Sequence, residues 1–300
     1  MNVHTEINTL FPVRNTPEQK QAFRGWALKR GNAAGLYTRE ENNAGHINIV
    51  FGDPVNADVV FTAHYDTPKR SLLPNIMLPL NPLLKILYTL AVVLSILLPA
   101  LAAAFALMKL YPDRRELALF AYACVYFLLF YLTMRAFKNP HNANDNTSGT
   151  AAVMQLAERG MPGAAFILFD DEEKGKKGSN AYAAEHGNVK HDSFVINMDC
   201  IGNGNIFVVQ ESKRAHEHRQ YAVFAERLKR LPAELIMSVD ASMNSDHKNF
   251  DKSLGIAACL KGKRIVYTPR IHTPKDTVCD TRLIDMLVSA LAGEYNKKPE

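Results

Sequence analysis

Two stretches without a charged residue, 86–108 and 117–134, limit what this chain can fold into. Both come close to the length of about 20 residues that a helix needs to cross a bilayer. Soluble helices rarely stay apolar on all sides over such a length, and only the short polar sequence KLYPDRRE separates the two stretches. We therefore expect an inserted hydrophobic hairpin over residues 72–137 that contains two transmembrane helices. The alternative is a pair of helices buried in a large soluble core, or an apolar lid.

The sequence on either side of the hairpin has the pattern of an α/β protein. Short apolar runs predict strands at 46–51, 58–64, 164–169, 193–198 and 205–210, with shorter strands near 235 and 256. Helices are predicted at 148–159, at 215–230, from residue 281, and after Gly178, where Ser179 is placed to cap the helix. This alternation predicts a mixed, mostly parallel central sheet with helices on both faces. Residues 1–71 and 138–300 should form one discontinuous domain.

Charge and cysteine content exclude several classes of protein. The formal net charge of +5 is small for 300 residues, and no basic stripe with interleaved aromatic residues is present, so nucleic acid is not an expected partner. The four cysteines lack CxxC spacing, which predicts neither a disulfide framework nor a thiolate zinc site. The N-terminal residues show no apolar signal-peptide core. We expect a cytoplasmic location for the soluble part.

Four consecutive acids, DDEE at 170–173, directly follow the strand predicted at 164–169. Carboxylates this close repel one another unless positive charge lies among them. Other potential metal ligands follow predicted strands, precede a helix or lie late in the chain: His64, Asp66, Asp145, Asp199 and His272. In α/β sheets such positions converge at the carboxyl ends of the strands. Mixed imidazole and carboxylate ligands suit Zn²⁺ and related ions, whose charge would relieve the repulsion.

Six segments together resemble the zinc exopeptidase family that contains bacterial aminopeptidases, glutamate carboxypeptidases and glutaminyl cyclases. They are TAHYDTP, NDNTSGTAAVMQLAE, FDDEEKGKKGS, INMDCIG, NSDHKNF and IHTPKDT, and they occur in the family's order. The resemblance covers residues from about 44 to 70 and 139 to 296. This chain departs from the family in the long connection between His64 and Asp145, in Asp171, and in the lysines at 174, 176 and 177.

The resemblance implies a centre with two divalent metal ions, expected to be Zn²⁺. It implies that His64, Asp145 and Asp199 bind one ion, and that Asp145, Glu173 and His272 bind the other, with Asp145 bridging. Glu172 would be the general base, and Asp66 would orient His64. Asp170 and Asp171 are expected to be structural. Residues expected in the substrate pocket are Asp246, His247 and Tyr267.

The expected function is that of a membrane-anchored dizinc aminopeptidase acting on peptides with a free N-terminus. Two alternatives remain, namely a glutaminyl cyclase-like acyltransferase and a non-catalytic receptor or scaffold on the same fold. Because every expected ligand position and Glu172 are present, an enzyme is favoured over a scaffold.

The hairpin should attach the enzyme to a lipid bilayer through residues 83–137 as an integral membrane protein. Five basic residues flank it, against three at its turn: Lys69, Arg70, Lys85, Arg135 and Lys138, against Lys109, Arg114 and Arg115. Under the positive-inside rule this excess places the catalytic domain on the cytoplasmic side. A short linker in place of residues 83–137 should leave metal binding and hydrolysis of small substrates intact.

Overall fold

The computed structural model describes residues 2–70, 73, 76–134 and 137–295. One sheet runs through the described chain in the order β1-β2-β4-β3-β5-β8-β6-β7, with β9 paired to β8. Its strands are β1 (Thr38–Asn43), β2 (His46–Phe51), β3 (Val59–His64), β4 (Ala164–Phe169), β5 (Val195–Met198), β6 (Ile206–Glu211), β7 (Glu234–Ser238), β8 (Ser253–Lys261) and β9 (Val266–Tyr267). The predicted α/β class with a mixed sheet is confirmed.

Parallel pairing is concentrated in the middle of the sheet. Strands β4, β3, β5 and β8 are parallel neighbours, and β6 is parallel to β7. The pairs β1/β2, β2/β4, β6/β8 and β8/β9 are antiparallel. The carboxyl ends of β3, β4 and β5 therefore meet at the same edge of the sheet, where ligands bind in open α/β sheets.

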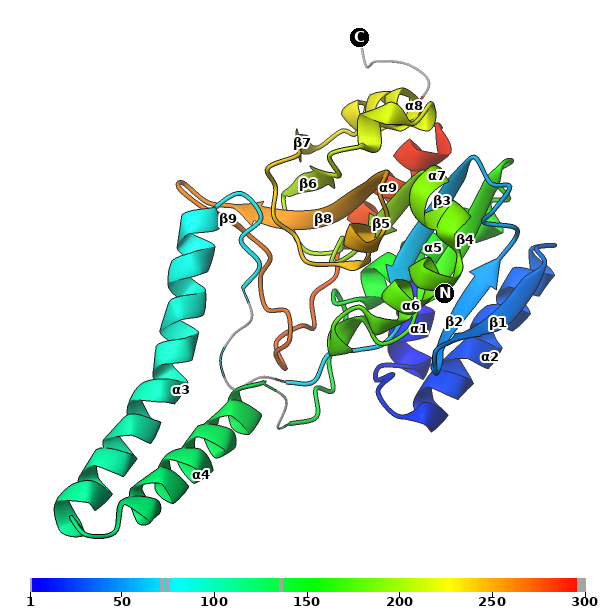
Figure 1. Cartoon of the computed structure of the whole chain (residues 1–300). Coiled ribbons are helices and arrows are strands. Elements are labelled where there is room, and N and C mark those ends of the chain that lie inside the picture. The colour runs from blue at the N-terminus through cyan, green and yellow to red at the C-terminus, as the bar shows by residue number, and fades with distance from the viewer. Residues whose placement is uncertain (1, 71–72, 74–75, 135–136, 296–300) are drawn as a thin grey trace.

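Helices cover both faces of the sheet, as predicted (Figure 1). Alternate residues of one strand point to opposite faces, so Phe61 packs in one apolar cluster with α1, α2, α5, α8 and α9, and Val60 packs in another with α6 and α7. The helices are α1 (Val3–Leu10), α2 (Pro17–Ala33), α5 (Thr147–Glu158), α6 (Lys177–Glu185), α7 (Gly187–Asp192), α8 (Gln220–Lys229) and α9 (Thr281–Ala292).

Two features of the sequence interpretation need correction. Ser179 does not cap its helix, because α6 begins at Lys177 after Lys176, whose φ of 58° lies in the left-handed region. The hydroxyl of Ser179 instead donates to Asp246 from inside the helix. In addition, α1, α2 and β1 precede the first predicted element.

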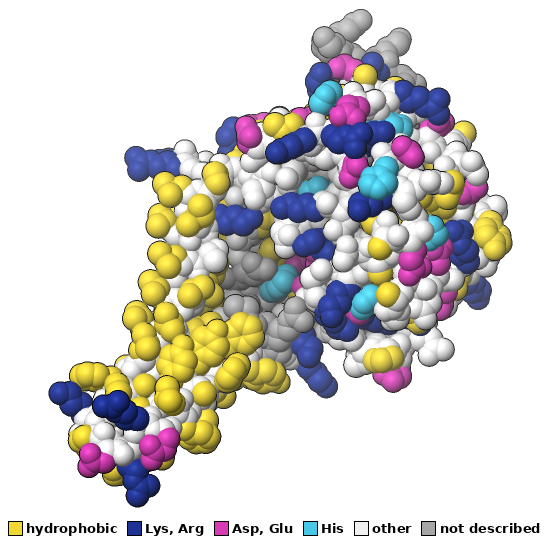
Figure 2. Space-filling model, in the orientation of Figure 1, with side chains coloured by type: hydrophobic (Ala, Val, Ile, Leu, Met, Phe, Trp, Pro, Cys, Tyr) yellow, Lys and Arg dark blue, Asp and Glu magenta, His cyan; other side chains and the backbone are white. Residues whose placement is uncertain are grey.

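The inserted segment forms two long antiparallel helices, α3 (Pro82–Leu110) and α4 (Arg115–Met134), which project from the globular part (Figure 1). Both are long and apolar enough to cross a membrane. Both helices extend beyond the predicted ranges of 86–108 and 117–134. Helix α3 begins earlier, at Pro82, because proline is well suited to the first position of a helix. Figure 2 shows hydrophobic side chains over the visible surface of the hairpin, with charged side chains at its tip.

The base of the hairpin is attached to the sheet. A bridge between Arg70 and Phe137 closes it, with the Arg70 amide donating to the Phe137 carbonyl at 3.0 Å. On the side of α3, Met77 pairs with Thr268 and packs against the apolar cluster of β6 and β8. The insertion therefore leaves the globular part and returns to it at one place. The predicted flanking residue Arg135 lies outside the described residues.

Candidate metal centre

The predicted metal ligands come together at the carboxyl edge of the sheet. His64 is the last residue of β3 and pairs in register with Phe169 of β4, which immediately precedes the four acids. Asp199 follows β5, and Asp145 comes just before α5. His272 reaches the same place from the loop between β9 and α9. Residues far apart in the sequence thus form a single cluster of imidazoles and carboxylates.

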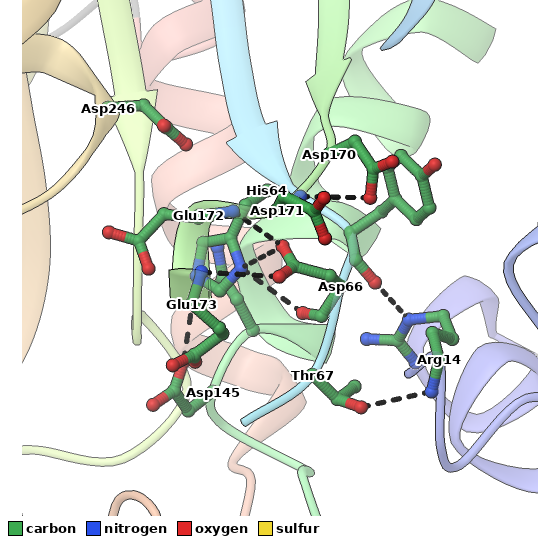
Figure 3. A network of polar contacts seen from close by, with 12 residues as sticks. Arg14, His64, Asp66, Thr67, Asp145, Asp170, Asp171, Glu172, Glu173 and Asp246 are labelled. Carbon is green, nitrogen blue, oxygen red and sulfur yellow. Dashed lines mark hydrogen bonds and ion pairs between the residues drawn. The ribbon is translucent and has the colours of Figure 1, made fainter. Parts of the chain in front are cut away.

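The two carboxylate oxygens of Asp145 face different histidines. Oδ1 lies 3.6 Å from His64 Nε2, and Oδ2 lies 3.1 Å from His272 Nε2. Asp199 Oδ1 lies 3.7 Å from His64 Nε2, while Glu173 Oε2 lies 3.4 Å from His272 Nε2. Figure 3 shows Glu173 and Asp145 next to each other below His64, and ligand atoms of these three residues lie within 4.8 Å of one another. The five side chains therefore form two groups that share Asp145.

Asp66 connects His64 to the acidic segment. Its Oδ1 is 3.4 Å from His64 Nδ1 and also accepts a hydrogen bond of 3.0 Å from the backbone amide of Glu172. Its Oδ2 accepts a 3.2 Å bond from the amide of Glu173. This buried carboxylate thus contacts the imidazole and holds the 3₁₀ turn Glu172–Lys174 in place.

The four consecutive acids divide into two pairs with different surroundings. Lys20, a buried residue of α2, donates to both Asp170 and Asp171. Burial alone would raise the pKa of the Asp171 carboxyl, but hydrogen bonds from Lys20 and Lys174 hold that pKa below its usual range. Glu173 lies beside His272 instead, and the Glu172 carboxylate points away from His64 (Figure 3). Asp170 and Asp171 are therefore both engaged by a buried lysine.

The loop that carries Asp145 is held by groups from three parts of the chain. Asp276, which is fully buried, accepts hydrogen bonds of 3.0 Å from the amides of Asn144 and Asp145. Asn146 caps α5 and accepts a further bond from the amide of Cys200, next to Asp199. At Gly149 a Cβ atom would lie 2.1 Å from the carbonyl oxygen of Met198. Only glycine allows α5 to begin this close to the end of β5.

Charge in the cluster is unfavourable in the absence of cations. Burial raises the pKa of Glu172 and of Glu173, and neighbouring carboxylates raise both further. For His64, burial opposes protonation, but the carboxylates of Asp199 and Asp66 raise its pKa above the usual value. A divalent cation would reverse this repulsion. The donor set is therefore one that a bound metal ion would stabilise.

A cavity of about 550 Å³ adjoins the cluster. Glu173, His272 and Asp66 line it on the side of the sheet. Its opposite wall belongs to the hairpin, with Tyr88, Thr89 and Val92 from α3 and Thr133 from α4. The hairpin therefore contributes to the space in which a substrate would lie, a role that we did not predict from the sequence.

The three residues predicted for the substrate pocket are not among those that line this cavity. Asp246 and His247 are buried, and they bond to Ser179 and Gln210 respectively. His247 lines a much smaller space next to Asp199. Tyr267 lies in β9 and pairs with Leu260 of β8. Their assignment to the substrate pocket stays a prediction.

Three residues important for the site were missed. Lys20 and Arg14 belong to N-terminal segments for which no element was predicted; Arg14 is fully buried and donates to the carbonyl of Tyr65 and to the Thr147 hydroxyl. No motif marks either of them. Asp276 lies within the segment IHTPKDT, so its position beside His272 was a usable signal.

Solved structures with this fold include proteins named as an aminopeptidase, a Zn-dependent exopeptidase and a glutaminyl cyclase. The chain resembles the LapA aminopeptidase of Legionella pneumophila with a TM-score of 0.58 and 14% identity, covering 98% of this chain and 68% of that one. A Zn-dependent exopeptidase from Parabacteroides distasonis gives 0.61 and 14%, covering 99% and 96%. A glutaminyl cyclase from Porphyromonas gingivalis gives 0.57 and 14%, covering 98% and 94%. At this identity the likeness establishes the fold, and among curated proteins no sequence matches the chain.

The sequence itself identifies the family. Residues 133–290 match the model of peptidase family M28, and this range contains Asp145, Glu172, Glu173, Asp199 and His272. The chain belongs to peptidase family M28. The resemblance that we drew from the sequence segments is thereby confirmed.

Proposed function

We propose that this protein is a membrane-anchored dizinc aminopeptidase that hydrolyses peptides with a free N-terminus. The observation that carries the proposal is the arrangement of Asp145 between two groups of ligands, one with His64 and Asp199 and the other with Glu173 and His272. Membership of a peptidase family supports the reaction class. Two solved structures with a similar fold are named as a Zn-dependent exopeptidase and an aminopeptidase. These names support zinc as the metal and cleavage at the N-terminal end of the peptide.

The ligand spacing fits zinc. A tetrahedral Zn²⁺ site with bonds of about 2.0–2.1 Å to nitrogen and oxygen places neighbouring ligand atoms about 3.3–3.4 Å apart. The four distances between imidazole nitrogens and carboxylate oxygens within the two groups run from 3.1 to 3.7 Å. Separations of this size support the proposal that these side chains hold metal ions between them.

Glu172 is suited to move the proton. When bound, the metal ions would polarise the scissile carbonyl and lower the pKa of a water molecule. Asp66 fixes the backbone of Glu172 next to the ligand Glu173, and within the described residues no donor is bonded to the Glu172 carboxylate. Glu172 would take a proton from the attacking water and pass it to the leaving amine.

The domain organisation and membrane attachment form part of the proposal. Residues 1–71 and 138–300 make one catalytic domain, and residues 72–137 are an insertion that anchors it to a lipid bilayer with the catalytic domain on the cytoplasmic side. The length and apolar surface of α3 and α4 support this assignment.

The test is an assay of the full chain in neutral detergent, stripped of metal and then reloaded with Zn²⁺. Matched peptides with free and acetylated N-termini should differ, since an aminopeptidase cleaves only the former. A peptide with N-terminal glutamine would reveal a cyclase by loss of ammonia without hydrolysis. If the reloaded protein bound Zn²⁺ but changed none of these peptides, the scaffold alternative would replace the peptidase proposal.

A further inference from the structure

The cavity beside the metal centre has a positively charged rim. Lys69 follows β3, Lys85 lies in the first turn of α3, and Lys174 lies in the 3₁₀ turn after β4, and all three line the cavity. We call these three residues the lysine rim. Figure 2 shows Lys and Arg side chains around the hollow between the hairpin and the globular part.

Much of this charge is not balanced by protein carboxylates. Lys174 is paired with Asp171 at 2.9 Å. Lys69 and Lys85, by contrast, form no ion pair with a carboxylate among the residues that the structure describes. The ammonium of Lys85 is held by Ser242, whose hydroxyl accepts from it at 3.0 Å. This bond positions the charge without neutralising it.

The positive charge extends beyond the rim itself. Lys85 and Lys176 bond to Ser242 and Asn244, which are only two residues apart in the chain. Lys176 bonds to the neutral amide of Asn244 at 2.7 Å. An anion entering the cavity near Lys85 would therefore meet several cations.

The carboxylates that line the same cavity are already engaged. Asp66 accepts hydrogen bonds from the backbone amides of Glu172 and Glu173. Asp171 forms ion pairs with Lys20 and Lys174. Glu173 lies beside His272 and is a proposed metal ligand. Asp66 and Asp171 thus bind donors other than Lys69 and Lys85, and a carboxylate on the ligand would supply the opposite charge for these two lysines.

We propose that the lysine rim selects peptides with a carboxylate on the part that follows the scissile bond, as an acidic side chain or the C-terminus. This inference rests on the proposed aminopeptidase function. A free N-terminal ammonium would be repelled by lysines, so the rim has to face the other end of the peptide. A cavity of about 550 Å³ lies within the range of about 300–1,000 Å³ of small-ligand sites, and a short peptide fits it.

The proposal can be tested by binding, independently of turnover. We would use the full chain as Glu172→Gln in neutral detergent, loaded with Zn²⁺, and measure Kd by calorimetry. The peptides are Ala-Glu-Ala amide, its neutral match Ala-Gln-Ala amide, and Ala-Gln-Ala with a free C-terminus. The peptides with a carboxylate should bind about tenfold more tightly at low salt, and the ratio should fall as salt screens the charges.

Substitutions of single lysines show which of them cause the preference for peptides with a carboxylate. Lys85→Met or Lys69→Met should reduce the tenfold ratio to about threefold or less. Lys213→Met is the matched control, because Lys213 is exposed and is not among the residues that line the cavity, and it should leave the ratio unchanged. Binding of each variant to vesicles of phosphatidylserine is measured in parallel, since lysines near a hairpin could serve lipid headgroups.

The possible results separate the two proposals. Equal Kd values for the acidic and neutral peptides would overturn the inference and leave the peptidase function standing. An unchanged ratio in Lys69→Met and Lys85→Met, with weaker vesicle binding, would assign these lysines to the membrane and also overturn it. Failure of every peptide to bind, together with no hydrolysis by the unsubstituted protein, would overturn both.

Discussion

Asp145 is the residue on which the candidate centre depends most, because its two oxygens lie near different histidines. Asp145→Ala should therefore remove both metal ions together. His64→Ala and His272→Ala should each weaken one site preferentially. Elemental analysis of the three purified variants measures this directly, and two full equivalents of metal in Asp145→Ala would rule out the bridging role.

Glu172 should be separable from the ligands next to it. Glu172→Gln keeps the shape of the side chain and removes its ability to accept a proton, so turnover should fall by about 10²- to 10⁴-fold. Metal content should stay close to that of the unsubstituted protein, because Glu172 is not a proposed ligand. Steady-state kinetics with elemental analysis is the test. Full activity in this variant would mean that another group acts as the base.

At the scale of elements, the approach of α5 to β5 brings Asp145 to Asp199. Gly149→Ala would force a Cβ atom to within 2.1 Å of the Met198 carbonyl oxygen, and overpacking of this kind costs about 1–3 kcal/mol. We expect a lower Tm for the metal-free protein and weaker metal binding. Gly187→Ala is the control, since nothing lies within 4 Å of a Cβ there. Equal Tm values for the two variants would contradict the proposed close contact.

The central strands and the residues that gather at their carboxyl ends were predictable from the sequence, but the residues that hold those ends in place were not. Continuous apolar runs such as residues 164–169 reveal buried parallel strands, and His or Asp at their ends reveals the site. The amphipathic pattern of α2 is obscured because the helix buries Lys20 and Arg24 beside Phe23 and Ala27. β1 is polar along its length. Charged residues become buried only because their partners come from distant parts of the chain, which no local pattern contains.

For the whole molecule, the orientation of the hairpin can be measured. Carbonate washing should leave the full-length chain in the membrane fraction, because α3 and α4 would cross the bilayer. A cysteine placed at Asp113, in a chain whose other cysteines are replaced, should react with an impermeant reagent from outside the cell. Release by carbonate would identify the helices as a soluble lid, and reaction only after lysis would place the catalytic domain outside.

Because the hairpin forms part of the cavity wall, its deletion should affect the binding of peptides. Replacing residues 83–137 by a short Gly/Ser linker should leave metal binding intact, because every proposed ligand lies outside that segment. It would remove Lys85, Tyr88, Thr89, Val92 and Thr133 from the cavity wall. We therefore expect a raised KM for peptides, which kinetics on the metal-loaded variant would show; an unchanged KM would mean that the hairpin acts as an anchor alone.

The bridge between Arg70 and Phe137 has a consequence for the order of folding. Closing a flexible loop as long as this insertion would cost about 4 kcal/mol of chain entropy. A helical pair already inserted in lipid holds its two ends close together, which removes most of that cost. His64 and Asp145, which lie on opposite sides of the insertion, would then meet quickly only after the hairpin has entered the bilayer. Chains synthesised without membranes should accordingly take up zinc more slowly than chains synthesised with them, and insertion into the membrane would then be a maturation step for the proposed metal centre.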